Sequence, residues 1–435
     1  WREHEWVGKI SSAAACFSTK CSLESGSDEM RTIYVDKNLP RMFMVQMLRS
    51  VWPGVIWSPF SPVHVVDMQT PQLPGPKWLR LRNIQCGLCA TDLSLLFVDA
   101  DPASAPAALP GNARFYLGHE VVSEVVEVGA QVTRFKVGDR VVMESRFAGP
   151  NCHSQEIDPP CIYCAQGQTR LCENASLGLG AVGVGGGWGD GYTAHEAEVW
   201  PVPLQMSTDQ ASLIEPNSVA LHSVLRKPPL AGDHVLVIGA GIIGLLIVQM
   251  AKIVEPDCHV TVIARYPHQA EMARTLGADD VLTGSELYPE LAEITQAKYY
   301  RSPMNRGMLL GGFEVVYDCV GKKTTVSDGL RWARAGGTVV LVGVDLSTMK
   351  VDLNPVWYQE VDLIGSHTFG MENWHGRRVH TFDLVIRMFE EEAIRYAGLI
   401  THRFPFEQYK KAVAAAMDKR SGSIKVCFSY DAGIS

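Results

Sequence analysis

The sequence predicts an α/β protein with two domains, one mainly β and one built on a doubly wound parallel sheet. Its 435 residues are enough for two to three domains at about 150 residues each. Short strand-like runs separated by Pro and Gly fill the first part, and longer alternating strands and helices begin near residue 209. A glycine-rich turn at residues 239–244 joins an apolar strand to an apolar helix in this second part.

The composition is that of an ordinary globular protein. Hydrophobic residues make up 46 % of the chain and charged residues 20 %, which argues against a disordered, collagen-like or coiled-coil protein. The 39 Lys and Arg residues stand against 47 Asp and Glu residues, giving a net charge of −8. No strongly basic surface is expected, so we expect no nucleic-acid partner.

The 11 cysteines bear on the cellular compartment. An odd number excludes a fully paired disulfide framework. Residues 1–5 carry charges rather than the apolar core of a signal peptide, although a chain that begins at Trp1 can be a piece of a longer protein. We therefore expect a cytoplasmic, reducing location, where clustered cysteines are more often metal ligands than disulfides.

The longest apolar stretch, Val235–Met250, is short for a membrane helix and is interrupted by glycines and Gln249. A spanning helix needs about 20 apolar residues, so we expect no membrane segment.

Residues 1–41 mix Ser, Glu, Asp and Lys without a clear period, and we expect a poorly ordered extension there. The Gly-rich segment Gly178–Gly191 is either a set of tight turns, which we favour, or a loop that shapes a substrate cleft. Strand and turn patterns are expected over Phe43–Ser50, Val63–Met68, Lys77–Ile84, Glu120–Val128, Arg140–Glu144 and Ala194–Val202.

The second part alternates helices and strands, which implies βαβ units and a parallel sheet. We expect a helix with a loop insertion over Glu286–Gly311, and short strands with one helix, Phe406–Met417, after Gly365. The other expected helices are Gln210–Val224, Gly241–Ile253 and Gln269–Leu276. The expected strands are His234–Ile238, His259–Ile263, Val281–Leu282, Phe313–Tyr317, Thr338–Val342 and Ile424–Ser429.

The turn Gly239-Ala-Gly241-Ile242-Ile243-Gly244 has the GxGxxG spacing of a dinucleotide site, in the required place between a strand and a helix. Gly239 would allow the tight turn, Gly241 the close approach of a pyrophosphate, and Gly244 the packing of the helix on the sheet. The N–H groups at the helix start attract the anion. A packing segment without a ligand is the less favoured alternative.

The strand that follows bears on the choice of cofactor. A site for NAD usually carries an acidic residue about 20 residues further on, bonded to the ribose 2′-hydroxyl. This chain has Ala264 and Arg265 there, with His268 nearby. Because a guanidinium bonds phosphate oxygens in pairs, we favour NADP over NAD, unless Arg265 is merely a solvated charge.

The cysteines Cys161, Cys164 and Cys172 have the spacing of a structural zinc lobe, and Cys152 is the natural fourth ligand. Asp158 and His153 are poorer fourth candidates, and free or redox-active thiols are the alternative. The pair Cys86 and Cys89 lies too far from Cys161 to form a zinc ribbon with it.

Cys89 instead begins a Cys-Ala-Thr91-Asp92 run, and Gly-His119-Glu120 follows it. A thiolate, an imidazole and a carboxylate can form an open metal site with a position left for water or substrate. Glu215 is a further carboxylate, just before the domain that contains the glycine-rich turn. Each of these residues alone is a weak signal, since such residues often have only a structural role.

Together, these motifs in this order resemble the zinc-containing medium-chain dehydrogenases/reductases, over roughly residues 42–435. The resemblance implies a GroES-like catalytic domain at residues 42–212 and 366–435, and a Rossmann domain at 213–365. It also implies a substrate between the two domains and a homodimer or homotetramer.

By the same resemblance, Cys89, His119 and Glu120 look like the ligands of a catalytic zinc. Glu215 would bind the zinc directly or through its water, Thr91 would take the substrate proton, and Asp92 would orient His119.

Two positions depart from the family pattern. Ser94 stands where many members have the histidine that ends a proton relay, and the spacing before Cys161 is stretched, so Cys152 is the least secure lobe ligand. Cys86 replaces a small apolar residue, and we expect a buried thiol.

The activity that the resemblance implies is reversible alcohol oxidation with NADP or NAD, on a small alcohol or carbonyl compound. The alternatives are a zinc-independent NADPH reductase of the same fold and a non-catalytic NADP-binding protein.

Overall fold

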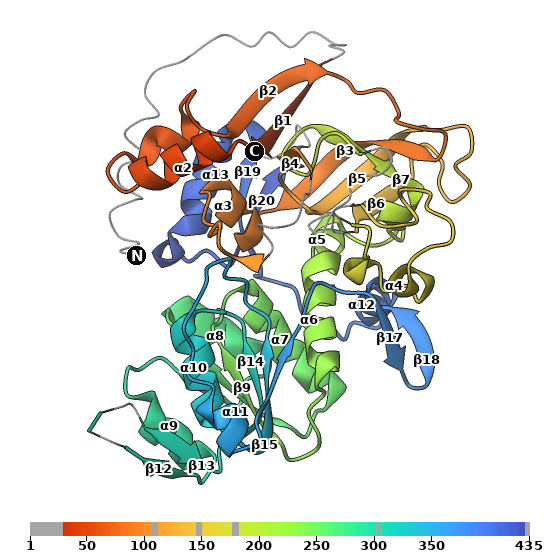
Figure 1. Cartoon of the computed structure of the whole chain (residues 1–435). Coiled ribbons are helices and arrows are strands. Elements are labelled where there is room, and N and C mark those ends of the chain that lie inside the picture. The colour runs from red at the N-terminus through yellow and green to blue at the C-terminus, as the bar shows by residue number, and fades with distance from the viewer. Residues whose placement is uncertain are drawn as a thin grey trace. The chain divides into compact units, whose positions relative to one another are not determined.

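The computed structural model describes residues 29–105, 112–144, 150–175, 182–301, 303–304 and 307–430. The chain divides into two compact units (Figure 1). The first comprises Trp1–Glu215 and Gly398–Ser435, and the second comprises Pro216–Ala397.

These units correct one predicted boundary. The first crossing, after Glu215, lies close to the expected residue 212, but the chain returns to the first unit at Gly398 rather than at residue 366. The reason is that the intervening segment is bonded to the second unit. In that segment Ser366 lies 2.9 Å from the hydroxyl of Ser223, and Glu372 accepts a hydrogen bond from His222.

The first unit is built on a seven-stranded, mostly antiparallel sheet in the order β19-β20-β3-β5-β6-β8, with β7 paired to β3. This confirms the predicted mainly-β domain. Its strands are β3 (Trp78–Gly87), β5 (Glu120–Val128), β6 (Arg140–Met143), β7 (Gly191–His195), β8 (Val199–Pro201), β19 (Ile400–Pro405) and β20 (Lys425–Ser429). Its helical segments include α3 (Ala90–Leu96), α4 (Ile162–Ala165), η3 (Thr169–Leu171), η4 (Glu196–Glu198), α5 (Thr208–Ser212), η5 (Phe406–Gln408), α13 (Tyr409–Met417) and η6 (Lys419–Ser421).

A second, three-stranded sheet in this unit corrects the prediction for residues 1–41. Its order is β2-β1-β4, with β1 (Glu29–Asp36), β2 (Val63–Gln69) and β4 (Arg114–Tyr116). Residues 29–41 are therefore ordered, because β1 pairs with both neighbours and buries Ile33 and Val35. Residues 1–28 lie outside the described part of the chain.

The strand expected over Phe43–Ser50 is wrong, since α2 (Leu39–Leu48) and η1 (Pro53–Trp57) occupy this region. The local helix-start signal decides the structure here. The side chain of Asn38 accepts a hydrogen bond from the N–H of Arg41, and Pro40 stands in the first turn.

The second unit contains six parallel strands in the order β11-β10-β9-β14-β15-β16. Counted along the chain this is the order 3-2-1-4-5-6 of a doubly wound dinucleotide-binding sheet, as predicted. Helices α7, α8 and α10 flank it (Figure 1). The strands are β9 (His234–Ile238), β10 (His259–Ile263), β11 (Asp280–Leu282), β14 (Phe313–Asp318), β15 (Ala333–Leu341) and β16 (Asp362–Gly365). The helices are α6 (Ile214–Arg226, which begins in the first unit), α7 (Ile242–Val254), α8 (Pro267–Thr275), α10 (Lys323–Trp332) and α11 (Asn354–Tyr358).

Three details of the second part differ from the prediction. The helix expected at 210–224 is divided at Leu213 into α5 and α6. The insertion contains helix α9 (Leu287–Ile294) and a hairpin of β12 (Lys298–Tyr300) and β13 (Met308–Leu310). After Gly365, a hairpin of β17 (Met371–Trp374) and β18 (Arg377–His380) precedes α12 (Thr381–Glu390), a helix that the prediction missed.

The apolar stretch Val235–Met250 is divided between β9 and α7. Within the described ranges, no helix is long and apolar enough to cross a bilayer.

Candidate functional site

Three of the predicted metal ligands converge at one end of the first unit's main sheet. One ligand atom each from Cys89, His119 and Glu120 lie within 4.8 Å of one another. The sheet register explains this convergence, because β3 and β5 pair antiparallel with Gly87 opposite Glu120. Cys89 follows the end of β3 and caps α3, while His119 directly precedes β5.

Gly87 makes room for this cluster. A Cβ atom at position 87 would lie 2.1 Å from Oε2 of Glu120, so a larger residue would displace the carboxylate. We did not predict this role for Gly87, since only the pairing of the two strands reveals it.

Asp92 lies beside the imidazole of His119. Its Oδ1 is 3.3 Å from Nδ1 of His119 and accepts a hydrogen bond of 2.9 Å from the N–H of Gly118. Burial lowers the pKa of His119, but the charges of Asp92 and Cys89 outweigh it and raise the pKa well above its ordinary value. Thr91 lies next to the cluster, with its hydroxyl oxygen 3.6 Å from the sulfur of Cys89.

A buried lysine, which the sequence analysis did not single out, forms an ion pair with Glu120. Lys425 projects from β20, and both it and Glu120 are only 1 % exposed. Its ammonium also donates to the carbonyl of Leu88 at 3.3 Å. Burial lowers the pKa of Lys425, but Glu120 overcomes this effect and holds the pKa above its ordinary value. A lone lysine within the apolar run Ile424–Ser429 was the available signal.

Glu215 lies within electrostatic reach of this cluster, although it does not belong to the three residues whose ligand atoms converge. It is 5 % exposed, and burial raises the pKa of its carboxyl to about 7. His119 and Lys425 oppose this rise, and Glu120 adds to it.

A small chamber of about 80 Å³ opens beside His119 and Asp92. Its polar lining comes mainly from the approach to β4 and from β4 itself. The lining includes Asn112, Arg114, Tyr116, Met143 and Glu198.

The four lobe cysteines Cys152, Cys161, Cys164 and Cys172 also converge, with their sulfur atoms within 4.8 Å of one another. Hydrogen bonds to sulfur surround them. Asn174 donates from its side chain to Cys152 at 3.1 Å, and from its backbone to Cys172 at 3.3 Å. His153 instead contacts the carbonyl of Cys164, and Asp158 is not part of the cluster.

The pKa shifts of these thiols follow from their burial and their packing against one another. Burial and the neighbouring thiols raise the pKa of Cys164, and burial raises that of Cys172. Burial also raises the pKa of Cys161, but backbone N–H groups outweigh it and bring that pKa to about 7. Four adjacent thiolates cannot all ionise without a positive charge, and a closed set of four sulfur ligands suits zinc.

The glycine-rich turn has the geometry of a nucleotide site. Gly239 has φ +95°, and Gly241 caps α7 with open space where its Cβ would stand. At Gly244 a Cβ would lie 1.9 Å from the carbonyl oxygen of Gly239, so the helix can start this close to the strand only with glycine. Ile242 and Ile243 begin α7, where N–H groups have no acceptor within the helix.

Arg265 lies just beyond the end of β10, the strand that pairs with β9 and so neighbours the glycine-rich turn. It is exposed, and its guanidinium lies 5.5 Å from the ring centre of Tyr266. His268 stacks on the same ring.

Cys86, in the first unit, is fully buried, as expected for its thiol.

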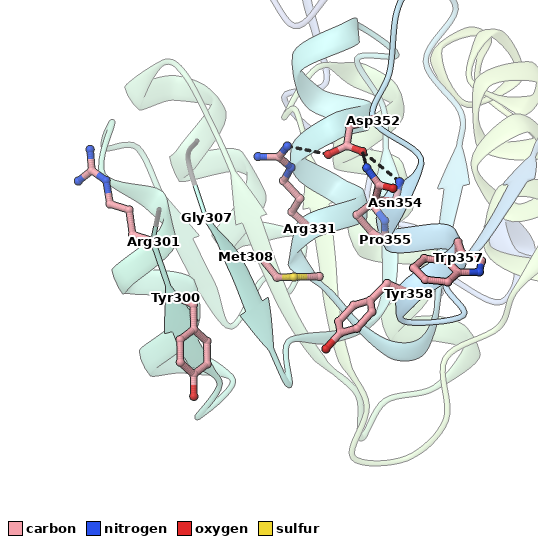
Figure 2. Close-up of a pocket in the computed structure, with 10 residues that line it drawn as sticks. All are labelled: Tyr300, Arg301, Gly307, Met308, Arg331, Asp352, Asn354, Pro355, Trp357 and Tyr358. Carbon is pink, nitrogen blue, oxygen red and sulfur yellow. Dashed lines mark hydrogen bonds and ion pairs between the residues drawn. The ribbon is translucent and has the colours of Figure 1, made fainter. Parts of the chain in front are cut away.

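A larger cavity of about 470 Å³ lies elsewhere in the second unit, between the β12–β13 hairpin and α11 (Figure 2). Figure 2 shows Tyr300 and Arg301 on one side and Trp357 and Tyr358 on the other. None of the predicted site residues line it, whereas Asp92 and His119 line the smaller chamber.

Family models match about half of the first unit and most of the second. Residues 75–204 match the alcohol dehydrogenase GroES-like domain, and residues 243–384 match the zinc-binding dehydrogenase domain. The chain is 28 % identical to D-arabinitol dehydrogenase 1 of Uromyces fabae over 77 % of this chain and 85 % of that protein. It is also 28 % identical to L-idonate 5-dehydrogenase of Vitis vinifera, over 82 % of this chain and 88 % of that one.

A solved structure from Sinorhizobium meliloti 1021, described as a zinc-binding dehydrogenase bound to NADP, has a similar fold. The TM-score is 0.67 at 23 % identity, covering 92 % of this chain and 99 % of that one.

The two glycines of the turn give a matched pair of variants. Gly244→Ala places a Cβ against the carbonyl of Gly239, so we expect a clear loss of thermal stability. Gly241→Ala meets no atom within 4 Å and has an ordinary φ of −72°, so the fold should persist. Its added methyl group should weaken NADP binding by about tenfold or more. Thermal unfolding and NADP titration check both, and equal melting temperatures for the two variants would contradict the packing argument.

The Glu120–Lys425 pair predicts a coupled effect on stability. Lys425→Met leaves Glu120 buried without its cation, and breaking such pairs costs about 3–5 kcal/mol. In the double variant Glu120→Gln/Lys425→Met no buried charge is left over, so most of this loss should be recovered. Urea denaturation of the two single variants and the double variant measures the coupling. Additive effects would show that the pair is not a unit.

Proposed function

We propose that this chain reversibly oxidises a hydroxyl group of a small polyol or sugar alcohol. The chain belongs to the zinc-containing medium-chain dehydrogenase/reductase family and is a zinc-type NAD(P)-dependent alcohol dehydrogenase. The observation that carries the proposal is the convergence of Cys89, His119 and Glu120, with His119 lining a small chamber.

Cys89, His119 and Glu120 would hold the catalytic zinc, and Glu215, which lies within electrostatic reach of them, would bind it directly or through its water. The four lobe cysteines would hold a structural zinc. The bound zinc supplies a Lewis acid that makes the substrate hydroxyl more acidic, and the nicotinamide accepts the hydride.

The chain's own residues have separate tasks in this scheme. Asp92 would fix the ring of His119 in orientation through its contact with Nδ1. Thr91, whose hydroxyl lies 3.6 Å from the sulfur of Cys89, would receive the substrate proton. Lys425 would balance the charge of Glu120, with which it forms a buried ion pair.

The chamber favours a small, polar substrate. Its volume of about 80 Å³ is too small for a long aliphatic chain, and Asn112, Arg114 and Tyr116 offer hydrogen-bonding groups. D-Arabinitol dehydrogenase among the relatives acts, by its name, on a substrate of this kind.

For the cofactor we propose NADP rather than NAD. Arg265 stands just beyond β10, where an acidic residue would select the ribose 2′-hydroxyl of NAD. A guanidinium there suits a 2′-phosphate.

We also propose a homodimer or homotetramer in the cytoplasm. The nine cysteines within the described ranges are all free, which fits a reducing compartment.

Metal analysis joined to activity tests the proposal. Wild-type protein should contain about one zinc for each of its two clusters and should oxidise polyols with NADP. Cys89→Ser should lose one zinc and at least about 100-fold in kcat/KM, since outer contacts alone are worth 10- to 100-fold. Cys164→Ser should also lose one zinc, but its main effect should be a lower melting temperature.

Two results would contradict it. A zinc-independent reductase would keep full activity in Cys89→Ser. A non-catalytic protein would bind NADP and one or two zinc ions but oxidise nothing in a panel of polyols, sugars, threonine and aliphatic alcohols.

Arg265→Ala tests the cofactor assignment. Loss of charge-assisted bonds to the 2′-phosphate should raise KM for NADP by about 10- to 100-fold and leave KM for NAD nearly unchanged. Arg274→Ala removes the same charge from an exposed position in α8 and serves as the control. An Arg265→Ala enzyme that keeps its preference for NADP would refute the assignment.

A further inference from the structure

Helix α2 is apolar on two opposite faces. Its inner residues Met42, Val45 and Leu48 pack against the hydrophobic core of the first unit, with Val45 fully buried. On the outer face, Leu39, Phe43, Met47 and Val51 follow one another at four-residue spacing through the helix and the turn after it. These four residues are 65 %, 62 %, 64 % and 76 % exposed, respectively. We call them the α2 stripe.

Such a helix is unusual at a surface. A helix that is apolar all round is normally buried, whereas α2 lies at the margin of its unit beside β1 and β2 (Figure 1). Met44, Trp52 and Phe60 in the same segment are also between 38 % and 55 % exposed. Together these side chains expose on the order of 700 Å² of apolar surface, above the largest patch of a typical monomer.

The α2 stripe is held rigidly. Gln46 donates to the carbonyls of Val98 and Ala100 at 3.0 and 2.9 Å, and Arg49 bonds to the segment that follows α3. Trp57 in η1 packs against Tyr409 of α13, with ring centres 5.3 Å apart. The exposed face is therefore fixed by the core behind it and does not depend on a fraying helix end.

The charges around the α2 stripe point to its partner. The stripe itself is uncharged, and the nearest arginines are matched on the same chain, Arg41 by Asp36 and Arg49 by Asp99. An anionic membrane would require uncompensated cations on this face, and the net charge of −8 opposes that interaction. Because Leu39, Phe43, Met47 and Val51 carry no charge, two copies of the stripe would meet without like charges facing each other.

We propose that the α2 stripe is an interface between two copies of this chain, in which the α2 helices pack against each other across a two-fold axis. Each partner in a stable complex buries about 800 Å², which is close to the apolar area exposed here. Like-for-like contact is what a two-fold axis imposes, and an uninterrupted stripe at helical spacing meets it without gaps. The proposal concerns assembly and does not depend on the substrate or cofactor proposed above.

Sedimentation velocity on the full chain tests the proposal. Phe43→Glu/Met47→Glu places two carboxylates on each side of the interface, so the mass should fall by a factor of two relative to wild type. Leu204→Glu, at an 86 % exposed position of the same unit, is the matched control and should leave the mass unchanged. Far-ultraviolet circular dichroism and zinc content establish that each variant is folded, and Phe43→Ser/Met47→Ser repeats the test without added charge.

Three outcomes would overturn the proposal. The first is a folded double variant with the mass of wild type. The second is a monomeric wild type whose stripe becomes accessible to a hydrophobic dye only after residues 1–28 are removed, which would make that segment the occupant. The third is a monomeric wild type that sediments with phosphatidylcholine vesicles through the same residues.

Discussion

The pairing of β3 with β5 is the constraint on which the candidate catalytic site depends. It sets Gly87 opposite Glu120, so that the residues just beyond the two strand ends, Cys89 and His119, meet although they are thirty positions apart. A slip by one residue would turn every side chain of β5 to the other face. Glu120 would then leave the cluster, and Lys425 on the neighbouring strand β20 would lose its partner. The hydrophobic alternation of these strands therefore holds the site as well as the core.

Much of this arrangement could be predicted because it is local. The glycine-rich turn needs only a strand, three glycines and a helix, all within eleven residues from His234 to Gly244. The lobe cysteines likewise lie close enough in the chain for their spacing to indicate a common cluster. The metal ligands of the open site were found through the order of their motifs, since no spacing rule joins Cys89 to His119.

Other features could not be predicted, and they share a physical reason. Lys425 lies more than three hundred residues from Glu120, so its pairing depends on β20 joining the sheet next to β3. Helix α2 was misread because Phe43 and Val45 suit a strand as well as a helix, while the cap at Asn38 decided the outcome. The predicted domain boundary at residue 366 was wrong because β17, β18 and α12 belong to the second unit, through contacts such as that of His222 with Glu372. A contact between residues this far apart leaves no pattern in the sequence.

The two cysteine-containing clusters differ in how they would treat a cation, and the difference follows from charge. Four thiolates surround a divalent metal completely, more than neutralise its charge and leave no open position, which suits a structural role. At the other cluster one thiol, one imidazole and one carboxylate converge, and Lys425 already offsets the carboxylate. Lys425 also interacts electrostatically with Cys89, so it offsets negative charge at more than one of the three converging residues. A divalent cation in this site would keep more of its positive charge, and that remaining charge is what polarises a hydroxyl group. The buried lysine would therefore act on the chemistry of the site as well as balance Glu120.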